Sequence, residues 1–74
     1  MADIKYEIKA NLAVLSEKSS GWKKELNLVS WNDKEAKFDI REWDEEHLKM
    51  SKGITLTKDE AVILLKALSA ELEK

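Results

Sequence analysis

Apolar and polar residues alternate strictly at the start of the chain. The apolar members share one parity: Ile4, Tyr6, Ile8, Leu12 and Val14. A period of two is typical of a half-buried β-strand. The pattern predicts one long bent strand over residues 4–17, or two short strands broken near Ala10–Asn11. The sequence EKSSG at 17–21 then predicts a turn, because serine and glycine favour turn conformations.

The next apolar segment, WKKELNLVSW at 22–31, predicts a second strand with an imperfect alternation. Leu26 and Leu28 share one parity, whereas Val29 and Trp31 share the other. A β-bulge inserts one residue and so reverses which parity faces inward. We therefore expect a bulge near Asn27–Leu28.

A polar turn at 32–36 precedes KFDIREW at 37–43, which predicts a third strand. Its alternation places Phe38 and Ile40 toward the core and Lys37, Arg41 and Trp43 outward. A charged loop over 44–53 follows, and Ile54-Thr55-Leu56 predicts a short fourth strand.

The C-terminal segment predicts a helix from about Lys58 to near the end of the chain. Thr57 and Glu60 have the spacing of a capping box, in which each side chain bonds a free backbone N–H of the other residue. One apolar stripe lies within an arc of roughly 100° and is expected to pack on the sheet. It consists of Ala61, Leu64, Leu65, Leu68 and Leu72.

A second apolar group lies on nearly the opposite side of this helix. It consists of Ile63, Ala67 and Ala70. Small residues allow close approach of another helix, so we interpret this group as a dimer interface. Alanine is also the best helix former, and helix propensity alone is the alternative explanation.

The element order β-β-β-β-α with short links predicts an α+β fold in one domain over residues 1–74. An antiparallel four-stranded sheet covered on one face by the helix fits those links. So short a chain buries only a modest core and often depends on disulfides, metals or oligomerisation. There is no cysteine and a single histidine, His47, so the composition favours self-association over a metal site.

Charge and hydropathy narrow the function further. The net charge is −2, without the basic excess that is typical of nucleic-acid-binding proteins. No apolar run approaches the ~20 residues of a membrane span, and the charged N-terminus does not resemble a signal peptide. We expect a cytoplasmic protein with no cofactor, no membrane partner and no small-molecule substrate.

An enzymatic function is not indicated by any group of residues. Asp44, Glu45 and Glu46 are interpreted as a solvated loop, and His47 beside them is expected to be exposed. The chain has only two glycines, so it lacks a glycine-rich phosphate loop. No serine has a histidine at a recognisable spacing, and we predict a protein that is not an enzyme.

The uncovered face of the sheet carries the most informative chemistry. Trp22, Trp31 and Trp43 all lie close to lysine or arginine in the sequence. Single-stranded nucleic acid is bound by such faces, because each stacked base gains about 1–3 kcal/mol and cations follow the phosphates. The predicted nucleic-acid-binding residues are Trp22, Lys24, Trp31, Lys37, Arg41, Trp43, Lys49 and Lys52. Trp31 could instead cap the core, and Arg41 could pair with Asp39 or Glu25.

Two short motifs in order resemble a known family. The sequence DIREW at 39–43, a loop of about ten residues, and KGITL at 52–56 before a helix resemble the C-terminal domain of the transcriptional coactivator positive cofactor four. With GWKKELN and VSWND included, the chain is more similar to the small bacterial YdbC-like members of that family. The resemblance covers residues 4–72.

The resemblance implies a homodimer of curved sheets, with paired helices at its interface and grooves that bind single-stranded DNA with little sequence preference. Arg41, Trp43 and Lys52 match family positions by this resemblance. The turn at 32–37 departs from the eukaryotic pattern of an aromatic residue flanked by lysines and a glycine, and Trp31 and Lys37 are candidates for those roles. Trp22 and Lys24 rest on their chemistry alone.

The predicted function is therefore non-catalytic, sequence-independent binding of single-stranded DNA by a homodimer. Transcription regulation, replication, repair and recombination all produce such strands. The sequence does not distinguish RNA from DNA as the ligand. The alternative is a transcription-associated protein-interaction module that binds a protein partner with the same exposed face.

Overall fold

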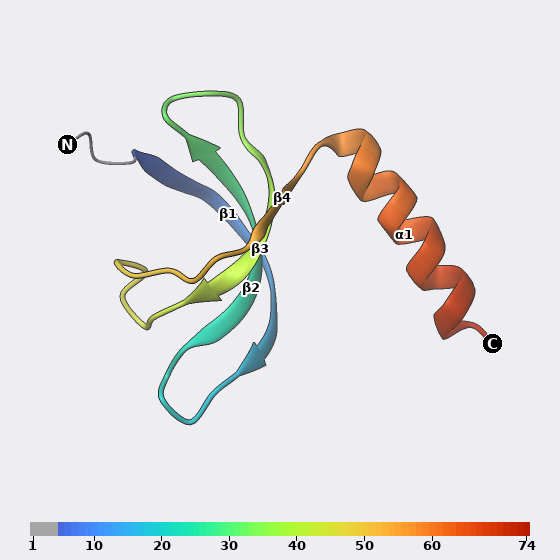
Figure 1. Cartoon of the computed structure of the whole chain (residues 1–74), viewed down its shortest axis with the longest axis horizontal. Helices are drawn as coiled ribbons and strands as arrows, with labels where there is room; N and C mark the ends of the chain where they lie inside the picture. The colour runs from blue at the N-terminus through green and yellow to red at the C-terminus, as the bar shows by residue number, and fades with distance from the viewer. Residues whose placement is uncertain (1–4) are drawn as a thin grey trace.

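The computed structural model describes residues 5–74, so Ile4 lies outside the described residues. It contains a four-stranded antiparallel sheet in the order β1-β2-β3-β4, followed by one helix (Figure 1). The elements are β1 (Tyr6–Glu17), β2 (Lys23–Trp31), β3 (Lys37–Trp43), β4 (Ile54–Leu56) and α1 (Lys58–Leu72). The predicted α+β class, element order and antiparallel sheet are confirmed.

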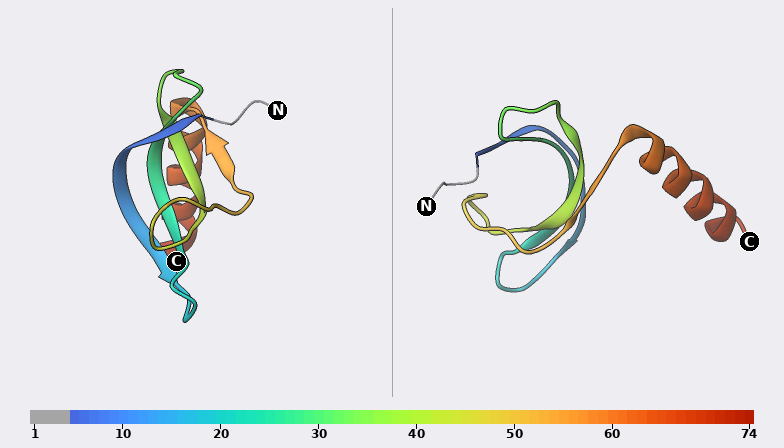
Figure 2. Two further views of the ribbon diagram at one scale, coloured as in Figure 1. Left: turned by 90° about the vertical axis from the view of Figure 1, so that its left-hand side faces the viewer. Right: turned by 45° about the horizontal axis from the view of Figure 1, so that its top comes forward.

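β1 is one long bent strand rather than two short ones. Its register against β2 shifts three times, and each shift leaves one β1 residue without a partner: Lys9, Leu12 and Leu15. Each extra residue bends the strand and increases its twist. As a result the sheet curls into an open half-cylinder (Figure 2).

The bulge predicted near Asn27–Leu28 in β2 is wrong. β2 pairs with β3 residue by residue, from Lys23–Trp43 to Val29–Lys37, without a shift. β2 is a central strand with a ladder on each edge, so an inserted residue there would disrupt two ladders. β1 is an edge strand and accommodates the bulges at the expense of one.

The two faces of the curled sheet have different surroundings. The loop between β3 and β4 folds back on the concave side, whereas α1 lies outside the curl (Figure 2). Alternation along paired strands places Glu25 and Arg41 on the concave face and Leu26 and Ile40 on the convex face.

The best-buried part of the molecule lies on the concave side. Val29 and Trp43 are fully buried, and so are the polar residues Asn27 and Asp39. The prediction that Trp43 points into solvent is therefore wrong. The chain turns back after β3, where Trp43 bridges to Met50 and the Asp44 N–H donates to the carbonyl of Lys49 at 3.2 Å. This loop covers the indole.

α1 begins with the predicted capping box. The Glu60 N–H donates to Thr57 Oγ1 at 3.1 Å, and the Thr57 N–H donates to Glu60 Oε1 at 2.8 Å. Both bonds satisfy backbone N–H groups that a helix start otherwise leaves unpaired. The helix start at Lys58 is confirmed.

The prediction that the stripe of α1 packs on the sheet is wrong for a single chain. α1 has no buried residue, and Leu65 and Leu72 are 64% and 80% exposed. β4 leads through Thr57 directly into a helix that points away from the sheet (Figure 1). Among the elements within residues 5–74, only β3 and β4 are neighbours of this helix. No helix within residues 5–74 has the length and apolar character needed to cross a membrane.

Candidate nucleic-acid interface

Three aromatic side chains form a row on the concave face, and we call Tyr6, Trp31 and Trp43 the aromatic row. Tyr6 lies between the two indoles, with ring centroids 5.9 Å from Trp31 and 5.3 Å from Trp43. These separations are those of favourable aromatic pairs. The row joins the start of β1 to the ends of β2 and β3.

Arg41 lies over this row. Its guanidinium carbon is 4.6 Å from the centroid of the Trp31 ring, within cation–π range. Trp31 is half-buried between Arg41 and Tyr6, so it is neither a fully covered core residue nor a free ring. The structure thus brings together two of the predicted site residues, one from β2 and one from β3.

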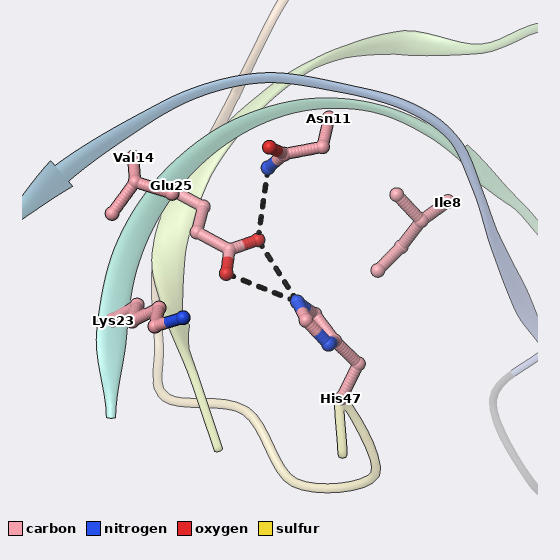
Figure 3. Close-up of a pocket in the computed structure, with 6 residues that line it drawn as sticks. All are labelled: Ile8, Asn11, Val14, Lys23, Glu25 and His47. Carbon is pink, nitrogen blue, oxygen red and sulfur yellow. Dashed lines mark hydrogen bonds and ion pairs between the residues drawn. The ribbon is translucent and has the colours of Figure 1, made fainter. Parts of the chain in front are cut away.

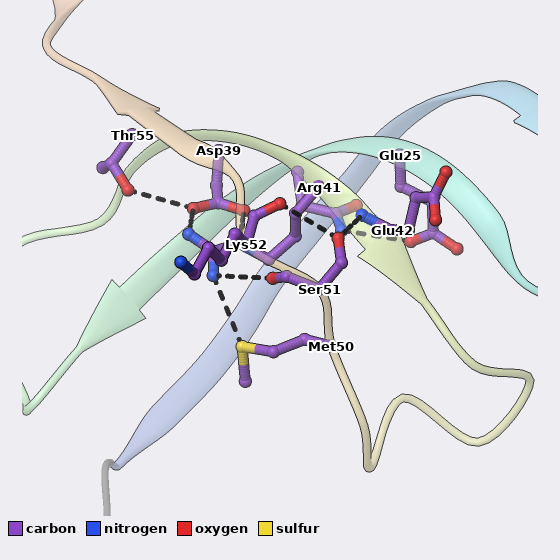
Figure 4. Close-up of polar contacts among 9 residues, drawn as sticks. Glu25, Asp39, Arg41, Glu42, Met50, Ser51, Lys52 and Thr55 are labelled. Carbon is purple, nitrogen blue, oxygen red and sulfur yellow. Dashed lines mark hydrogen bonds and ion pairs between the residues drawn. The ribbon is translucent and has the colours of Figure 1, made fainter.

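Asp39 holds Arg41 in place. Arg41 Nε donates to Asp39 Oδ1 at 2.6 Å and Nη2 donates to Oδ2 at 2.8 Å, while Thr55 Oγ1 also donates to Oδ2 at 3.0 Å (Figure 4). This fork pairs Arg41 with Asp39 rather than with Glu25. Because two bonds in a planar fork fix the guanidinium, Arg41 offers a rigid surface.

Part of the loop before β4 also contacts this arginine. Nη1 of Arg41 lies 3.4 Å from the sulfur of Met50 and 3.5 Å from the carbonyl oxygen of Ser51 (Figure 4). Gly53 permits the close approach, since a Cβ there would collide with the Ile40 carbonyl and the Cβ of Arg41. β4 can therefore begin directly against β3. Lys52, the residue before Gly53, lies near Arg41 (Figure 4).

A second polar cluster surrounds Glu25, whose side chain is 3% exposed. Glu25 Oε1 accepts from the amide of Asn11 at 3.2 Å (Figure 3). It also accepts from the amide of Asn27 at 3.0 Å. His47 Nε2 lies 3.0 Å from each carboxylate oxygen. An unpaired buried carboxylate would be costly, so these partners are required for the site to form.

His47 therefore differs from its expected role as an exposed loop residue. Its ring packs 5.7 Å from Trp43, and its backbone carbonyl accepts a 2.6 Å hydrogen bond from the Tyr6 hydroxyl. Its φ of 58° lies in the left-handed region that non-glycine residues rarely adopt. Sequence reasoning missed these contacts, because His47 is 22 residues from Glu25 and 41 from Tyr6.

Asp44 organises the start of the same loop. Its Oδ1 accepts from the N–H groups of Leu48 at 2.9 Å and Lys49 at 3.0 Å. The Lys49 N–H is the main cause that lowers the pKa of this carboxyl below its ordinary value, because the bond favours the charged form. The bond fixes the backbone of Lys49, whose side chain is exposed.

The predicted lysines divide between the two faces. Lys37, Lys49 and Lys52 are exposed and have no ion pair within residues 5–74. Lys24, in contrast, is the backbone partner of Glu42 in the β2–β3 ladder, and strand alternation places its side chain on the convex face. Its assignment to the same face as Arg41 is therefore wrong. Its neighbour Lys23 lines the concave side instead.

Trp22 is half-buried and precedes β2 by one residue. Its carbonyl accepts from the Lys18 N–H at 2.7 Å, which fixes its backbone at the β1–β2 turn. It does not join the aromatic row. Within residues 5–74, no three His, Cys, Asp or Glu side chains are arranged to hold a metal ion.

Two comparisons with known proteins identify the relatives of this chain. The family model described as Transcriptional Coactivator p15 (PC4) matches residues 18–67, from the β1–β2 turn into α1. An uncharacterized protein of Treponema pallidum (strain Nichols) is 45% identical over 62 residues, which are 84% of this chain and 73% of that protein. The matched segment contains Arg41, Asp39 and the glycine before β4. The chain therefore belongs to the family of the transcriptional coactivator p15, PC4.

Proposed function

We propose that this protein binds single-stranded DNA without catalysis, along the concave face of its sheet, and acts in a transcription-associated role. The observation that carries the proposal is the pairing of Arg41 with Trp31 at 4.6 Å, next to lysines that have no ion pair within residues 5–74. Stacking planes beside cations are what a single strand requires. Membership of the PC4 family supports the same function.

The charges of the groove determine how a strand would lie in it. Glu25 and Asp39 are buried carboxylates on the concave face and would repel phosphates. Lys23, Lys37 and Lys52 have their ammonium groups available instead. The bases therefore turn toward the sheet, and the phosphates follow the lysines. A duplex binds less well, because its bases are already stacked and their faces are not available.

The roles of the tryptophans follow from their burial. Trp31 is half-buried on the concave face and has the guanidinium of Arg41 over its ring, so the planar guanidinium backed by Trp31 supplies the principal stacking plane. Trp43 lies beneath the loop and supports the row without contacting a ligand. Trp22, at the β1–β2 turn, is a further stacking plane for a DNA strand that leaves the concave face.

We propose further that two copies associate through α1 and the convex face. Large apolar side chains of α1 are exposed: Val62, Ile63, Leu65, Leu68 and Leu72. Within residues 5–74 the fully covered apolar side chains are Val29 and Trp43, a small core for a chain of this length. A second copy would cover both apolar surfaces, with Ile63, Ala67 and Ala70 among its helix contacts.

A titration with oligo-thymidine tests the function. Binding is expected to quench the tryptophan fluorescence, and added salt should reverse the quench with a log–log slope of about −0.7 per phosphate contacted. A single strand should bind more tightly than a duplex of the same length. A response that is absent or insensitive to salt would contradict the proposal and favour a protein partner for this face.

A matched pair of charge reversals locates the bound strand. Lys52→Glu, beside Arg41, should weaken binding and make the salt slope shallower, because a phosphate contact is lost. Lys66→Glu on α1 makes the same charge change away from the groove and should have a smaller effect. Equal effects of the two variants would indicate that net charge alone drives binding.

A further inference from the structure

A cavity of about 440 Å³ opens on the concave side, between β1, β2 and the loop after β3. Its volume lies within the range of about 300–1,000 Å³ that is typical of small-ligand sites. Neither Arg41 nor Trp31 lines the cavity. It is lined by Ile8, Asn11, Val14, Lys23, Glu25 and His47.

The walls of this cavity suit a flat aromatic ligand. Ile8 and Val14 contribute aliphatic surface from β1, and His47 contributes the edge of an imidazole from the loop (Figure 3). Val14 is 49% exposed, although apolar, so part of this surface has no cover within the described chain. A nucleobase would bury such surface on its faces.

One hydrogen-bond acceptor in the cavity, Oε2 of Glu25, has unused capacity. Glu25 Oε1 accepts from the amides of Asn11 and Asn27 and lies 3.0 Å from His47 Nε2, whereas within residues 5–74 Oε2 has only His47 Nε2 within hydrogen-bond distance, also at 3.0 Å. A carboxylate oxygen has two lone pairs, so Oε2 can accept one more donor.

Asn11 adds a second acceptor. Its Nδ2 donates to Asn27 Oδ1 at 2.6 Å and to Glu25 Oε1 at 3.2 Å, and both of these partners are acceptors in the cluster. The amide orientation is thus fixed by its surroundings, and Oδ1 receives no hydrogen bond from residues 5–74. Lys23 contributes an ammonium donor to the same cavity.

Guanine is the base whose edge complements this set. Its N1–H and N2–H₂ are adjacent donors, which a carboxylate and an amide oxygen can accept, and its O6 accepts from a lysine. Thymine presents one N–H between two carbonyl oxygens, which the carboxylate repels. Cytosine and adenine each present one amino group beside an acceptor.

We propose that this cavity is a subsite for one base of the bound strand and that it prefers guanine over thymine. The proposal rests on the proposed function and deepens it. The rest of the concave face binds any base sequence, because every base has a flat face that can stack. This one position selects a base by hydrogen bonds to Glu25 and Asn11.

The test compares thymidine oligonucleotides of about 15 nucleotides, within the usual size range of single-strand sites, with the same strand carrying one central guanine. The strand can slide to place that guanine in the cavity. The single guanine is expected to tighten binding about five- to tenfold. Deoxyinosine at the same position lacks the 2-amino group and should recover only part of this gain.

Two variants test the cavity itself. Val14→Trp fills it from an exposed wall on an edge strand and should bring the ratio of guanine to thymine affinity close to unity. Glu25→Gln removes the carboxylate and should also reduce this ratio, with circular dichroism used to confirm that the variant folds. Glu71→Gln on α1 removes a carboxylate far from the cavity and should keep the ratio unchanged.

The outcomes separate the two proposals. If oligo-thymidine binds but guanine gives no gain, the subsite is wrong and the proposed function stands. A gain that survives Val14→Trp would also overturn the subsite, because the base then binds elsewhere. If no oligonucleotide binds, the proposed function itself fails.

Discussion

The concave and convex sides of the sheet are completed in different ways. On the concave side the loop between β3 and β4 closes over Trp43, and Asp39 and Glu25 have hydrogen-bond partners within one chain. On the convex side apolar residues remain in contact with solvent, and α1 has no buried residue. One chain thus forms its candidate ligand site but leaves the apolar residues of its convex side and of α1 exposed.

This difference indicates what each side is for. Polar groups that are satisfied internally hold aromatic and cationic side chains in a defined geometry, which a ligand can use without reorganising them. An uncovered apolar surface gains free energy from any apolar partner in proportion to the area removed from water. The concave side is suited to a polar ligand and the convex side to another apolar protein surface.

The largest expected effect is a loss of folding stability on the concave side, which the loop closes. Trp43→Ala should reduce the free energy of unfolding by about 3–5 kcal/mol, because it removes a fully buried indole and leaves a cavity under the loop. Urea denaturation at a fixed protein concentration measures this loss. Trp22→Ala, at a half-buried position, is the control and should cost less; equal losses would mean that the loop does not seal a core around Trp43.

The next largest effect is expected on self-association through α1, whose apolar side chains are exposed. Leu68→Glu and Ala67→Glu place a charge on the apolar stripe and on the opposite face of α1, respectively. The face that a second copy covers should lose roughly 2 kcal/mol or more of association energy, which sedimentation analysis detects as a shift to monomer. Lys66→Glu is the matched control on the same turn. A dimer unchanged by both apolar substitutions would remove α1 from the interface.

A smaller effect on stability is expected at the contact between Arg41 on β3 and Trp31 on β2. Arg41→Lys keeps the charge but loses the fork with Asp39 and the planar surface over Trp31, and should cost about 1–2 kcal/mol of stability. Thermal denaturation measures the loss. Lys24→Arg on the convex face is the reverse exchange and should leave stability nearly unchanged; a larger loss there would contradict the assignment of faces.

Local patterns in the sequence predicted the elements well. The boundaries of β3 and β4 and the start of α1 follow from alternation over a few residues and from the Thr57–Glu60 capping box, all of which act within a few positions. The one bulge predicted, near Asn27–Leu28, was placed on the wrong strand, because a change of parity indicates an inserted residue but does not show which of two paired strands contains it. Only the pairing shows that β1, as the edge strand, contains them.

The candidate site was predicted in part. Arg41 and Trp31 do lie together on one face, because strand alternation and antiparallel pairing bring them there. Trp43, His47 and Lys24 were misassigned. Trp43 and His47 depend on a loop that returns across the sheet. The face of Lys24 depends on the register of β2 against β3, which pairs Lys24 with Glu42 and Glu25 with Arg41.

The sequence alone determined the order of the elements, the bounds of β3 and β4, the start of α1 and the chemistry available to the protein, since propensity, alternation and capping depend on neighbours along the chain. The tertiary structure decided which face of the sheet is closed, which tryptophan is buried and which carboxylates accompany the arginine. Those outcomes depend on contacts between residues tens of positions apart, such as Tyr6 with His47 and Asp39 with Thr55. Their free energies depend on three-dimensional proximity and burial, which periodicity along a chain does not encode.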